Sequence, residues 1–113
     1  MVPYRVYVIE LAGMPGQGTA DRWLYVGQSA KTPAERFAQH KAGGPFSNPD
    51  VRKFGRRLLP RLYEQIHPFE VRDAAERAEA ALAQSLRNSG YEVVGKHGQP
   101  LVIRRTPKVP GPR

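Results

Sequence analysis

The chain has 113 residues, no cysteine, and 18 Lys+Arg against 10 Asp+Glu, which gives a formal net charge of +8 and a pI near 10.3. This length predicts a single domain. The absence of cysteine excludes disulfide frameworks and thiolate metal sites, and it is typical of a cytoplasmic protein. No apolar run approaches the roughly 18 residues of a membrane span. The N-terminal MVPYRVYVIEL carries no basic leader, so neither a membrane partner nor a secretory signal is expected.

Two strands are predicted at the start of the chain. Residues 4–11 (YRVYVIEL) are apolar at nearly every position and rich in β-branched and aromatic side chains, a pattern typical of a strand covered on both faces. Residues 12–22 hold three Gly and one Pro and therefore predict a loop. Trp23–Val26 is then expected to form a second strand, antiparallel to the first.

The clearest helix start follows the second strand. Thr32-Pro33-Ala34-Glu35 offers a Thr N-cap, a Pro at the first helical position and a Glu three residues after the cap, which is a capping box. We expect a helix over Pro33–Ala42, ended by Gly43-Gly44. Arg36 and His40 lie one turn apart and share one face. The predicted buried stripe lies on a different face and consists of Ala34, Phe37 and Ala38.

Two more helices and one more strand are predicted in the middle of the chain. Asn48-Pro49-Asp50 opens a helix that continues to about Leu58 before Pro60 stops it. Arg61–Ile66 (RLYEQI) alternates apolar and polar residues and predicts a third strand. A second capping box, Asp73-Ala74-Ala75-Glu76, starts a helix that ends at Gly90. Its expected apolar stripe, with Glu79 beside it, is Ala75, Ala78, Leu82 and Leu86.

The C-terminal part predicts a hairpin and a tail. Tyr91–Val94 and Leu101–Arg104 are short strand patterns on either side of a turn at 95–98. Residues 106–113 (TPKVPGPR) hold three Pro and two cations and predict a disordered basic tail, which leaves 1–105 as the domain. The order of elements indicates a small α/β (α+β) domain with a mainly antiparallel sheet and helices packed on it.

Five side chains are suited to phosphodiester chemistry, which needs a base for the attacking water, positive charge on the phosphoryl oxygens and help for the leaving oxygen. They are two phenols on neighbouring strands, a guanidinium, an imidazole and a carboxylate: Tyr7, Tyr25, Arg36, His40 and Glu79. Magnesium and manganese prefer oxygen ligands and often take only one or two protein carboxylates. A tyrosine base needs positive charge nearby, because its reference pKa is about 10. Taken singly, the five also fit plainer roles in sheet packing or on a solvated surface.

The run VYV…LYVGQSAKTPAERFAQH resembles the GIY-YIG nuclease superfamily, which includes homing endonucleases, some restriction enzymes and the incision subunit of nucleotide excision repair. Val6-Tyr7 falls at the end of the first motif, and Tyr25-Val26-Gly27 matches the second. Arg36 falls on the first-helix arginine and His40 on the residue one turn later. The helix that contains ERAEAALAQSL, with Glu79, resembles the segment that carries the metal-binding glutamate. The resemblance covers residues 4 to 95.

The resemblance implies a three-stranded antiparallel sheet flanked by helices, and hydrolysis with one divalent cation, Mg or Mn. Tyr7 is the implied general base, with Tyr25 beside it in support. Arg36 is implied to stabilise the phosphoryl charge, Glu79 to bind the metal and His40 to assist.

Two positions depart from the family pattern. The glycine that begins the first motif is Arg5 here, and the asparagine that often follows the last helix has no clear counterpart near Asn88 or Tyr91. Glu76 competes with Glu79 as the metal ligand, although its spacing from Asp73 favours a capping role. These departures keep open a module with the same fold that binds nucleic acid without cleaving it.

The basic residues predict a surface for nucleic acid. A solvated helix face is the plainer interpretation, but phosphate contacts would supply affinity without sequence choice. Our first hypothesis is a stand-alone endonuclease with low sequence specificity, acting on DNA rather than RNA. A third alternative is a basic RNA- or ribosome-associated protein, and no protein partner is indicated. The candidate phosphate contacts are Lys31, Lys41, Arg52, Lys53, Arg56, Arg57 and Arg61.

Overall fold

The computed structural model of the chain describes residues 3–13 and 23–94. The predicted turn at 95–98, the strand Leu101–Arg104, the tail 106–113 and most of the loop 12–22 lie outside the described residues. Within them the elements, including a 3-10 helix η1, are β1 Arg5–Leu11, β2 Trp23–Ser29, α1 Pro33–Ala42, α2 Pro49–Phe54, β3 Gly55–Leu58, η1 Pro60–Leu62, α3 Arg72–Asn88 and β4 Glu92–Val94.

The four strands form one mixed sheet in the order β3-β1-β2-β4. β1 pairs antiparallel with β2 along its whole length, from Arg5↔Ser29 to Leu11↔Trp23, and antiparallel with β3 on its other side. β4 pairs parallel with β2. The expectation of a three-stranded antiparallel sheet is therefore wrong in strand number and direction, although the mixed α+β class is confirmed. The parallel pair exists because the chain crosses over through its helices before it returns to β2.

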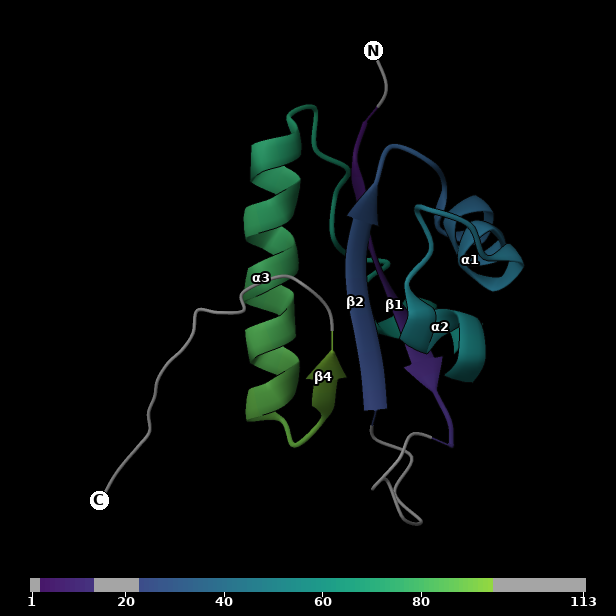
Figure 1. Cartoon of the computed structure of the whole chain (residues 1–113). Coiled ribbons are helices and arrows are strands. Elements are labelled where there is room, and N and C mark those ends of the chain that lie inside the picture. Colours follow the sequence, from purple (N-terminus) through teal and green to yellow (C-terminus); the bar gives the residue numbers. More distant parts are fainter. Residues whose placement is uncertain (1–2, 14–22, 95–113) are drawn as a thin grey trace.

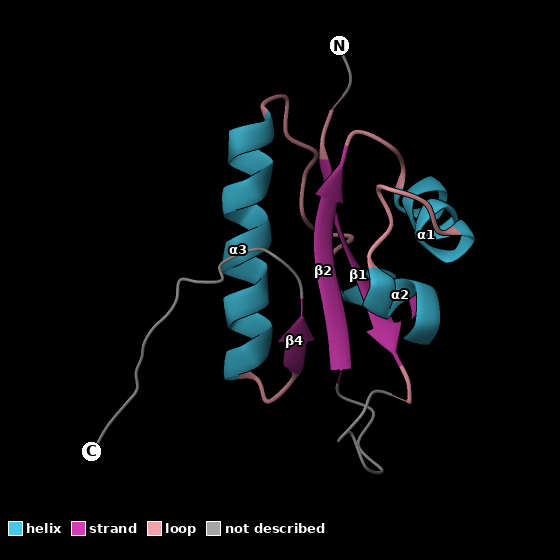
Figure 2. Ribbon diagram, viewed as in Figure 1, coloured by secondary structure: helices cyan, strands magenta, loops and turns pink. Residues whose placement is uncertain are grey.

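Helices cover both faces of the sheet (Figures 1 and 2), with α3 on one face and α1 and α2 on the other. Successive side chains of a strand point to opposite faces. Val6 and Val8 of β1 accordingly pack in the cluster that includes α3, whereas Tyr7, Ile9 and Leu11 pack in a second cluster with α2. Six of the seven β1 residues are buried, which confirms the prediction of a strand covered on both faces.

The predicted start and end of α1 are confirmed. The Thr32 Oγ1 accepts a hydrogen bond from the Glu35 amide at 3.1 Å, and the Glu35 carboxylate accepts one from the Thr32 amide at 2.9 Å, so the capping box is complete. The expected buried stripe is confirmed only at Phe37, which is partly buried against the cluster that contains Tyr7. Ala34 and Ala38 are exposed, and the one fully buried side chain of the helix is His40. The helix thus contacts the sheet through its last turn, and that turn brings His40 onto Tyr7.

The segment after α2 differs from the prediction. α2 ends at Phe54 because Gly55 turns to an extended conformation, and its amide closes the last turn on the Val51 carbonyl. A Cβ at Gly55 would collide with that same carbonyl, so only glycine fits there. The next residues, expected to continue the helix to Leu58, form β3 on the free edge of β1 instead.

The predicted strand Arg61–Ile66 is wrong. Pro60 begins the short helix η1, and the amides of Tyr63 and Glu64 both bond the Pro60 carbonyl. The apolar residues of this segment, whose spacing was interpreted as strand alternation, pack instead against the cluster on the α3 face; they are Leu62, Tyr63 and Ile66.

The second predicted capping box is also wrong. The N-cap of α3 is Val71, which is extended and makes no side-chain cap, and Asp73 and Glu76 both lie inside the helix. Glu76 pairs with Arg72 one turn earlier, with 3.5 Å between Oε2 and Nε. The helix packs on the sheet mainly through Ala75, Ala83, Leu86 and the partly buried Ala78 and Leu82. Among the described residues, no helix is both long and apolar enough to cross a membrane.

Candidate active site

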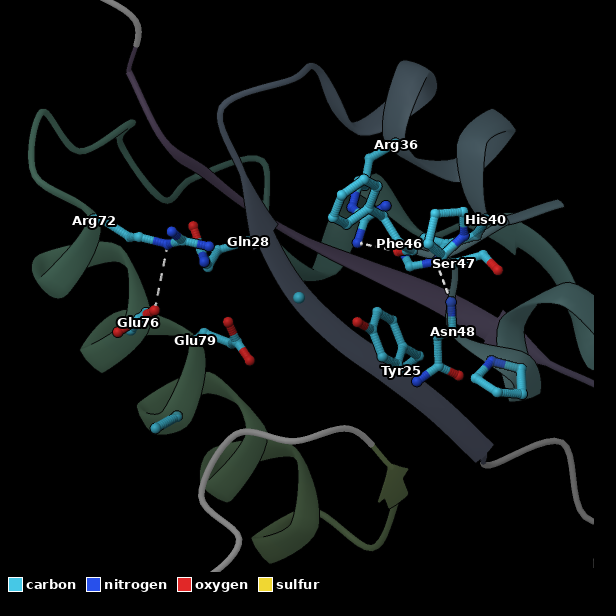
Figure 3. A pocket seen from close by; sticks show the side chains of 14 residues that line it. Tyr25, Gln28, Arg36, His40, Phe46, Ser47, Asn48, Arg72, Glu76 and Glu79 are labelled. Carbon is cyan, nitrogen blue, oxygen red and sulfur yellow. Dashed lines mark hydrogen bonds and ion pairs between the residues drawn. The ribbon is translucent and has the colours of Figure 1, made fainter. Parts of the chain in front are cut away.

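An open pocket of about 680 Å³ lies beside β2. β4 pairs with β2 only as far as Tyr25, and the pocket lies along the next residues of that strand. One wall comes from α1 and the loop that joins it to α2, and the other comes from the first half of α3 (Figure 3). The lining side chains include Tyr25, Gln28, Arg36, His40, Phe46, Glu76 and Glu79.

The fold brings the five predicted catalytic side chains together from four elements. Tyr25, Arg36, His40 and Glu79 all line the pocket. Tyr7 lies directly behind them, with its ring centroid 6.2 Å from that of Tyr25 and 6.3 Å from that of His40. Tyr7 is only 1% exposed and does not line the pocket, so Tyr25 is the phenol that meets it.

Gly27 makes room for the Tyr7 ring. The two residues are direct partners across β1 and β2. A Cβ built on Gly27 would lie 2.6 Å from the Tyr7 Oη and 3.0 Å from the Tyr25 Cε2. Real Cβ atoms essentially never come so close to other heavy atoms. The glycine of the second motif therefore serves a close side-chain approach inside a strand, and not a tight turn after it.

The tautomer of His40 follows from its two hydrogen bonds. The Asn48 backbone amide donates to Nδ1 at 2.9 Å, so Nδ1 carries no proton. A neutral imidazole then holds its proton on Nε2, which faces the Tyr7 Oη at 3.1 Å. His40 therefore donates to Tyr7. Burial, helped by the nearby Arg36 charge, lowers the pKa of His40 to about 4, which keeps the ring neutral at pH 7.

The Tyr7 hydroxyl in turn donates a hydrogen bond to the Tyr25 hydroxyl. Its oxygen accepts from His40, so its own proton is available for the hydrogen bond that it shares with the Tyr25 hydroxyl. Three donors, the Asn48 amide, the His40 Nε2–H and the Tyr7 hydroxyl, thus all point along this series toward the Tyr25 oxygen. A series of donors in this direction stabilises negative charge at its end, which is the pocket-lining phenol.

Without a cation, both phenols are held protonated. Burial raises the pKa of Tyr7 far above its usual value, and Arg36 opposes this only in part. Burial and then the Glu79 charge raise the pKa of Tyr25, whereas Arg36 and the Tyr7 hydrogen bond lower it. Of these causes, the Glu79 charge is the one whose sign a bound cation would reverse.

Arg36 is fixed in the pocket wall by two hydrogen bonds. Its Nη1 donates to the Gln39 Oε1 at 2.6 Å, and its Nη2 donates to the Phe46 carbonyl at 2.9 Å. A guanidinium has five N–H donors, so these two bonds orient the group and leave capacity for phosphate oxygens.

Glu79 lies on the opposite wall, and Figure 3 shows its carboxylate and the Tyr25 hydroxyl pointing toward each other. Burial, followed by the charge of Glu76, raises the pKa of Glu79 to about 7. Glu76 is exposed and ion-paired with Arg72, so Glu79 is the carboxylate that is held in a partly desolvated place. A carboxylate in such a place is suited to a cation, which removes the cost of its burial.

The donor set fits one hard divalent cation. The described residues contain no group of three or more His, Cys, Asp or Glu side chains placed to hold a metal ion. Magnesium, however, usually keeps several waters and takes one or two protein oxygens. Glu79 supplies one carboxylate, and the Gln28 Oε1 on the pocket side of β2 is buried with no hydrogen-bond partner among the described residues. An unsatisfied buried carbonyl oxygen is a second donor of the preferred kind.

The seven basic residues predicted to contact phosphate are all exposed, and none lines the pocket. Five of them lie on α2, β3 and η1, near the edge of the sheet that β3 forms. Two of the seven have side-chain partners in the part of the chain that the structure describes. Lys41 donates to the carbonyls of Arg52 and Gly55 at the end of α2, at 3.1 and 2.9 Å. Arg57 pairs with Glu10 at 2.8 Å. The other basic side chains on these elements are Arg52, Lys53, Arg56 and Arg61, and Lys31 precedes α1.

The pocket residues that sequence reasoning missed include Gln28, Phe46 and Asn48. Gln28 follows the Tyr25-Val26-Gly27 motif directly, and that adjacency was a usable signal. Phe46 lies between Gly43-Gly44 and Pro49, and nothing in the sequence indicated its exposure. Asn48 was correctly given a helix-capping role, since its Oδ1 accepts from two α2 amides. The bond of its own amide to His40 had no sequence signal.

Comparison with known proteins adds no relative. No protein-family model, no curated protein and no solved structure matches the chain.

Proposed function

We propose that the protein is a metal-dependent endonuclease of the GIY-YIG type. One observation carries the proposal: a phenol, a guanidinium and a partly desolvated carboxylate from three separate elements line one pocket, with a neutral histidine and a second phenol behind them. These groups are the ones that phosphodiester hydrolysis requires. The same five residues are the ones that the sequence motifs indicate.

Tyr25 is the group that takes the proton of the attacking water. Its hydroxyl lines the pocket, whereas Tyr7 is buried behind it, so we assign the proton acceptor to Tyr25 and a supporting position to Tyr7. The water oxygen forms a bond to phosphorus, its proton goes to the Tyr25 oxygen, and the bond from phosphorus to the leaving oxygen breaks. Hydrogen bonds from Tyr7, and through it from His40, hold the negative charge on Tyr25 before that transfer.

Arg36 stabilises the charge that develops on the phosphoryl oxygens, because its bonds to Gln39 and Phe46 fix it before substrate binds. Glu79, with Gln28 as a second oxygen donor, would hold the cation. Bound there, Mg or Mn supplies Lewis-acid stabilisation of the phosphoryl and leaving oxygens. Neutralisation of the Glu79 charge by the cation would also remove one cause of the raised Tyr25 pKa.

The partner is nucleic acid, with DNA favoured over RNA, and the location is the cytoplasm. The net charge of +8 and the exposed cations on α2, β3 and η1 support phosphate contacts outside the pocket, which carry no sequence information by themselves. Sequence specificity is therefore low. A non-cleaving nucleic-acid-binding module is the second candidate, and the strongly raised pKa of Tyr7 together with Arg5 in place of the motif glycine favours it.

Nicking of supercoiled plasmid tests the proposal. We compare Mg, Mn and EDTA for the wild type, Glu79→Gln and the matched control Glu76→Gln, which changes a carboxylate one turn away in the same helix. The proposal expects metal-dependent nicking that Glu79→Gln abolishes and Glu76→Gln retains. Loss in Glu76→Gln alone would move the ligand to that residue. Tight binding without nicking in any metal would leave the binding module as the function.

A further inference from the structure

Phe46 is the largest apolar side chain exposed at the rim of the pocket. It is 73% exposed, and the only other large apolar side chain exposed to this degree among the described residues is Val71, at 61%. Phe46 lines the pocket itself. Single exposed apolar side chains are normal on protein surfaces, so the exposure of Phe46 does not by itself indicate a ligand. Its place in the lining of the polar pocket makes the ring available to a molecule that binds there.

The loop that carries Phe46 is held on both sides of that residue. The Ser47 amide and Oγ both donate to the Gly44 carbonyl, at 3.2 and 2.9 Å. The Asn48 amide bonds the His40 ring. Gly43 and Gly44 have φ of 86° and 103°, values that favour glycine and that turn the chain back toward the pocket. These bonds hold the loop that presents the ring, so the exposed position of Phe46 is built into the fold.

Phe46 is also tied to the phosphate-binding group. The Arg36 Nη2 donates to the Phe46 carbonyl at 2.9 Å, and Figure 3 shows the two residues on the same wall of the pocket, across from Glu79. A phosphate on Arg36 would therefore place the attached nucleotide within reach of the ring. In a nucleotide a single sugar separates the base from its phosphate, so the base is the part that can meet Phe46.

We propose that Phe46 is a stacking platform for an unpaired nucleobase next to the phosphate held by Arg36, so that the preferred substrate is a strand with an unpaired nucleotide at the site. A base within a duplex has both faces covered by its neighbours, whereas an unpaired base has a free face. Stacking on an aromatic side chain tolerates every base, which agrees with low sequence specificity. This inference rests on the proposed binding of nucleic acid in the pocket.

Binding in EDTA tests it without any cleavage step. The probe is a DNA duplex with 2-aminopurine as a one-nucleotide bulge, compared with the same duplex in which 2-aminopurine is paired. We measure affinity by anisotropy and stacking by the quenching of 2-aminopurine. The variants are Phe46→Ala, Phe46→Leu and Phe46→Trp. Val71→Ala is the matched control, because it truncates an exposed side chain that has no aromatic face.

The wild type should prefer the bulge and quench its fluorescence. Phe46→Ala and Phe46→Leu should each bind the bulge about 10-fold more weakly, the size expected for loss of one stacked base, and bind the paired duplex as before. Phe46→Trp should retain both the preference and the quenching, and Val71→Ala should match the wild type. Equal losses of affinity on both duplexes, wild-type affinity of Phe46→Leu for the bulge, or an equal loss in Val71→Ala would overturn the proposal.

The outcome is separable from that of the nuclease proposal. A Phe46-dependent preference for the bulge without nicking in any metal would uphold the stacking platform and remove the endonuclease. Metal-dependent nicking with no role for Phe46 in binding would uphold the endonuclease and remove the stacking platform.

Discussion

Glu79→Gln should stabilise the metal-free protein at pH 8 and lose this advantage at pH 4. Burial and Glu76 raise the pKa of Glu79 to about 7 in the folded state, from 4.5 in the unfolded chain. Between these two values the folded state binds more protons, so the contribution of Glu79 to stability is present below pH 4.5 and is lost as the pH rises through 7. At roughly 1.4 kcal/mol per pH unit, the loss amounts to about 3 kcal/mol.

His40 has the opposite effect over nearly the same range. Burial and Arg36 lower its pKa to about 4, from 6.5 in the unfolded chain. Here the unfolded state binds more protons, so the contribution of His40 to stability is present above pH 6.5 and is lost as the pH falls through 4. The size is again about 3 kcal/mol. In the wild type these two pH-dependent contributions to the free energy of unfolding largely cancel. Replacing either residue leaves the pH dependence of the other one visible.

Urea unfolding in EDTA, from pH 4 to pH 8, checks both statements. The free energy of unfolding of Glu79→Gln, minus that of the wild type, should grow by about 3 kcal/mol from pH 4 to pH 8. The same difference for His40→Gln should change by a similar amount in the other direction. A flat difference for Glu79→Gln across this range would refute the reasoning. Should His40→Gln fail to fold, the Glu79→Gln curve still decides.

Three further predictions concern the support of the site. Gly27→Ala should displace the Tyr7 ring, whose Oη would lie 2.6 Å from the new Cβ, and should lower both cleavage and thermal stability; an unchanged melting temperature would contradict that close contact. Asn48→Ala should cost about 1 kcal/mol through loss of the α2 N-cap, measured by urea unfolding, whereas Asn48→Asp should retain most of it. Joint replacement of Lys53 and Arg56 by Ala should weaken DNA binding and reduce the salt slope of log Kd by about 2, and an unchanged slope would remove α2 and β3 from the phosphate surface.

The parts of the fold that follow from short-range signals were predictable. The capping box at Thr32 and Glu35 and the apolar run of β1 gave the bounds of α1 and β1 nearly to the residue. The same box spacing at Asp73 and Glu76 was misleading. The helix α3 already begins at Arg72, and its N-cap, Val71, is extended and makes no side-chain capping hydrogen bond. A capping motif therefore predicts a helix start only where the residues before it are not themselves part of the helix.

Long-range pairing set the limits of the prediction. The four-residue β3 is too short for a period to identify it, and it forms on the free edge of β1. The strand pattern at Tyr91–Val94 did indicate β4, but its parallel pairing with β2 had no sequence signal. The burial of His40 is also a tertiary effect: the polar face predicted for α1 is the face that meets Tyr7. Chain order suggested which residues belong to the site, but the division between the pocket-lining Tyr25 and the buried Tyr7 needed the structure.

Single-turnover cleavage of an end-labelled DNA in Mg, with protein in excess, tests the central proposal most directly. We compare the wild type with Tyr25→Phe and Tyr7→Phe, and measure DNA affinity in EDTA for all three. We expect metal-dependent cleavage by the wild type, a loss of at least about 100-fold in Tyr25→Phe, a smaller loss in Tyr7→Phe, and unchanged DNA affinity in both variants. A wild type that binds DNA and never cleaves it, or a Tyr25→Phe variant that cleaves at the wild-type rate, would contradict it.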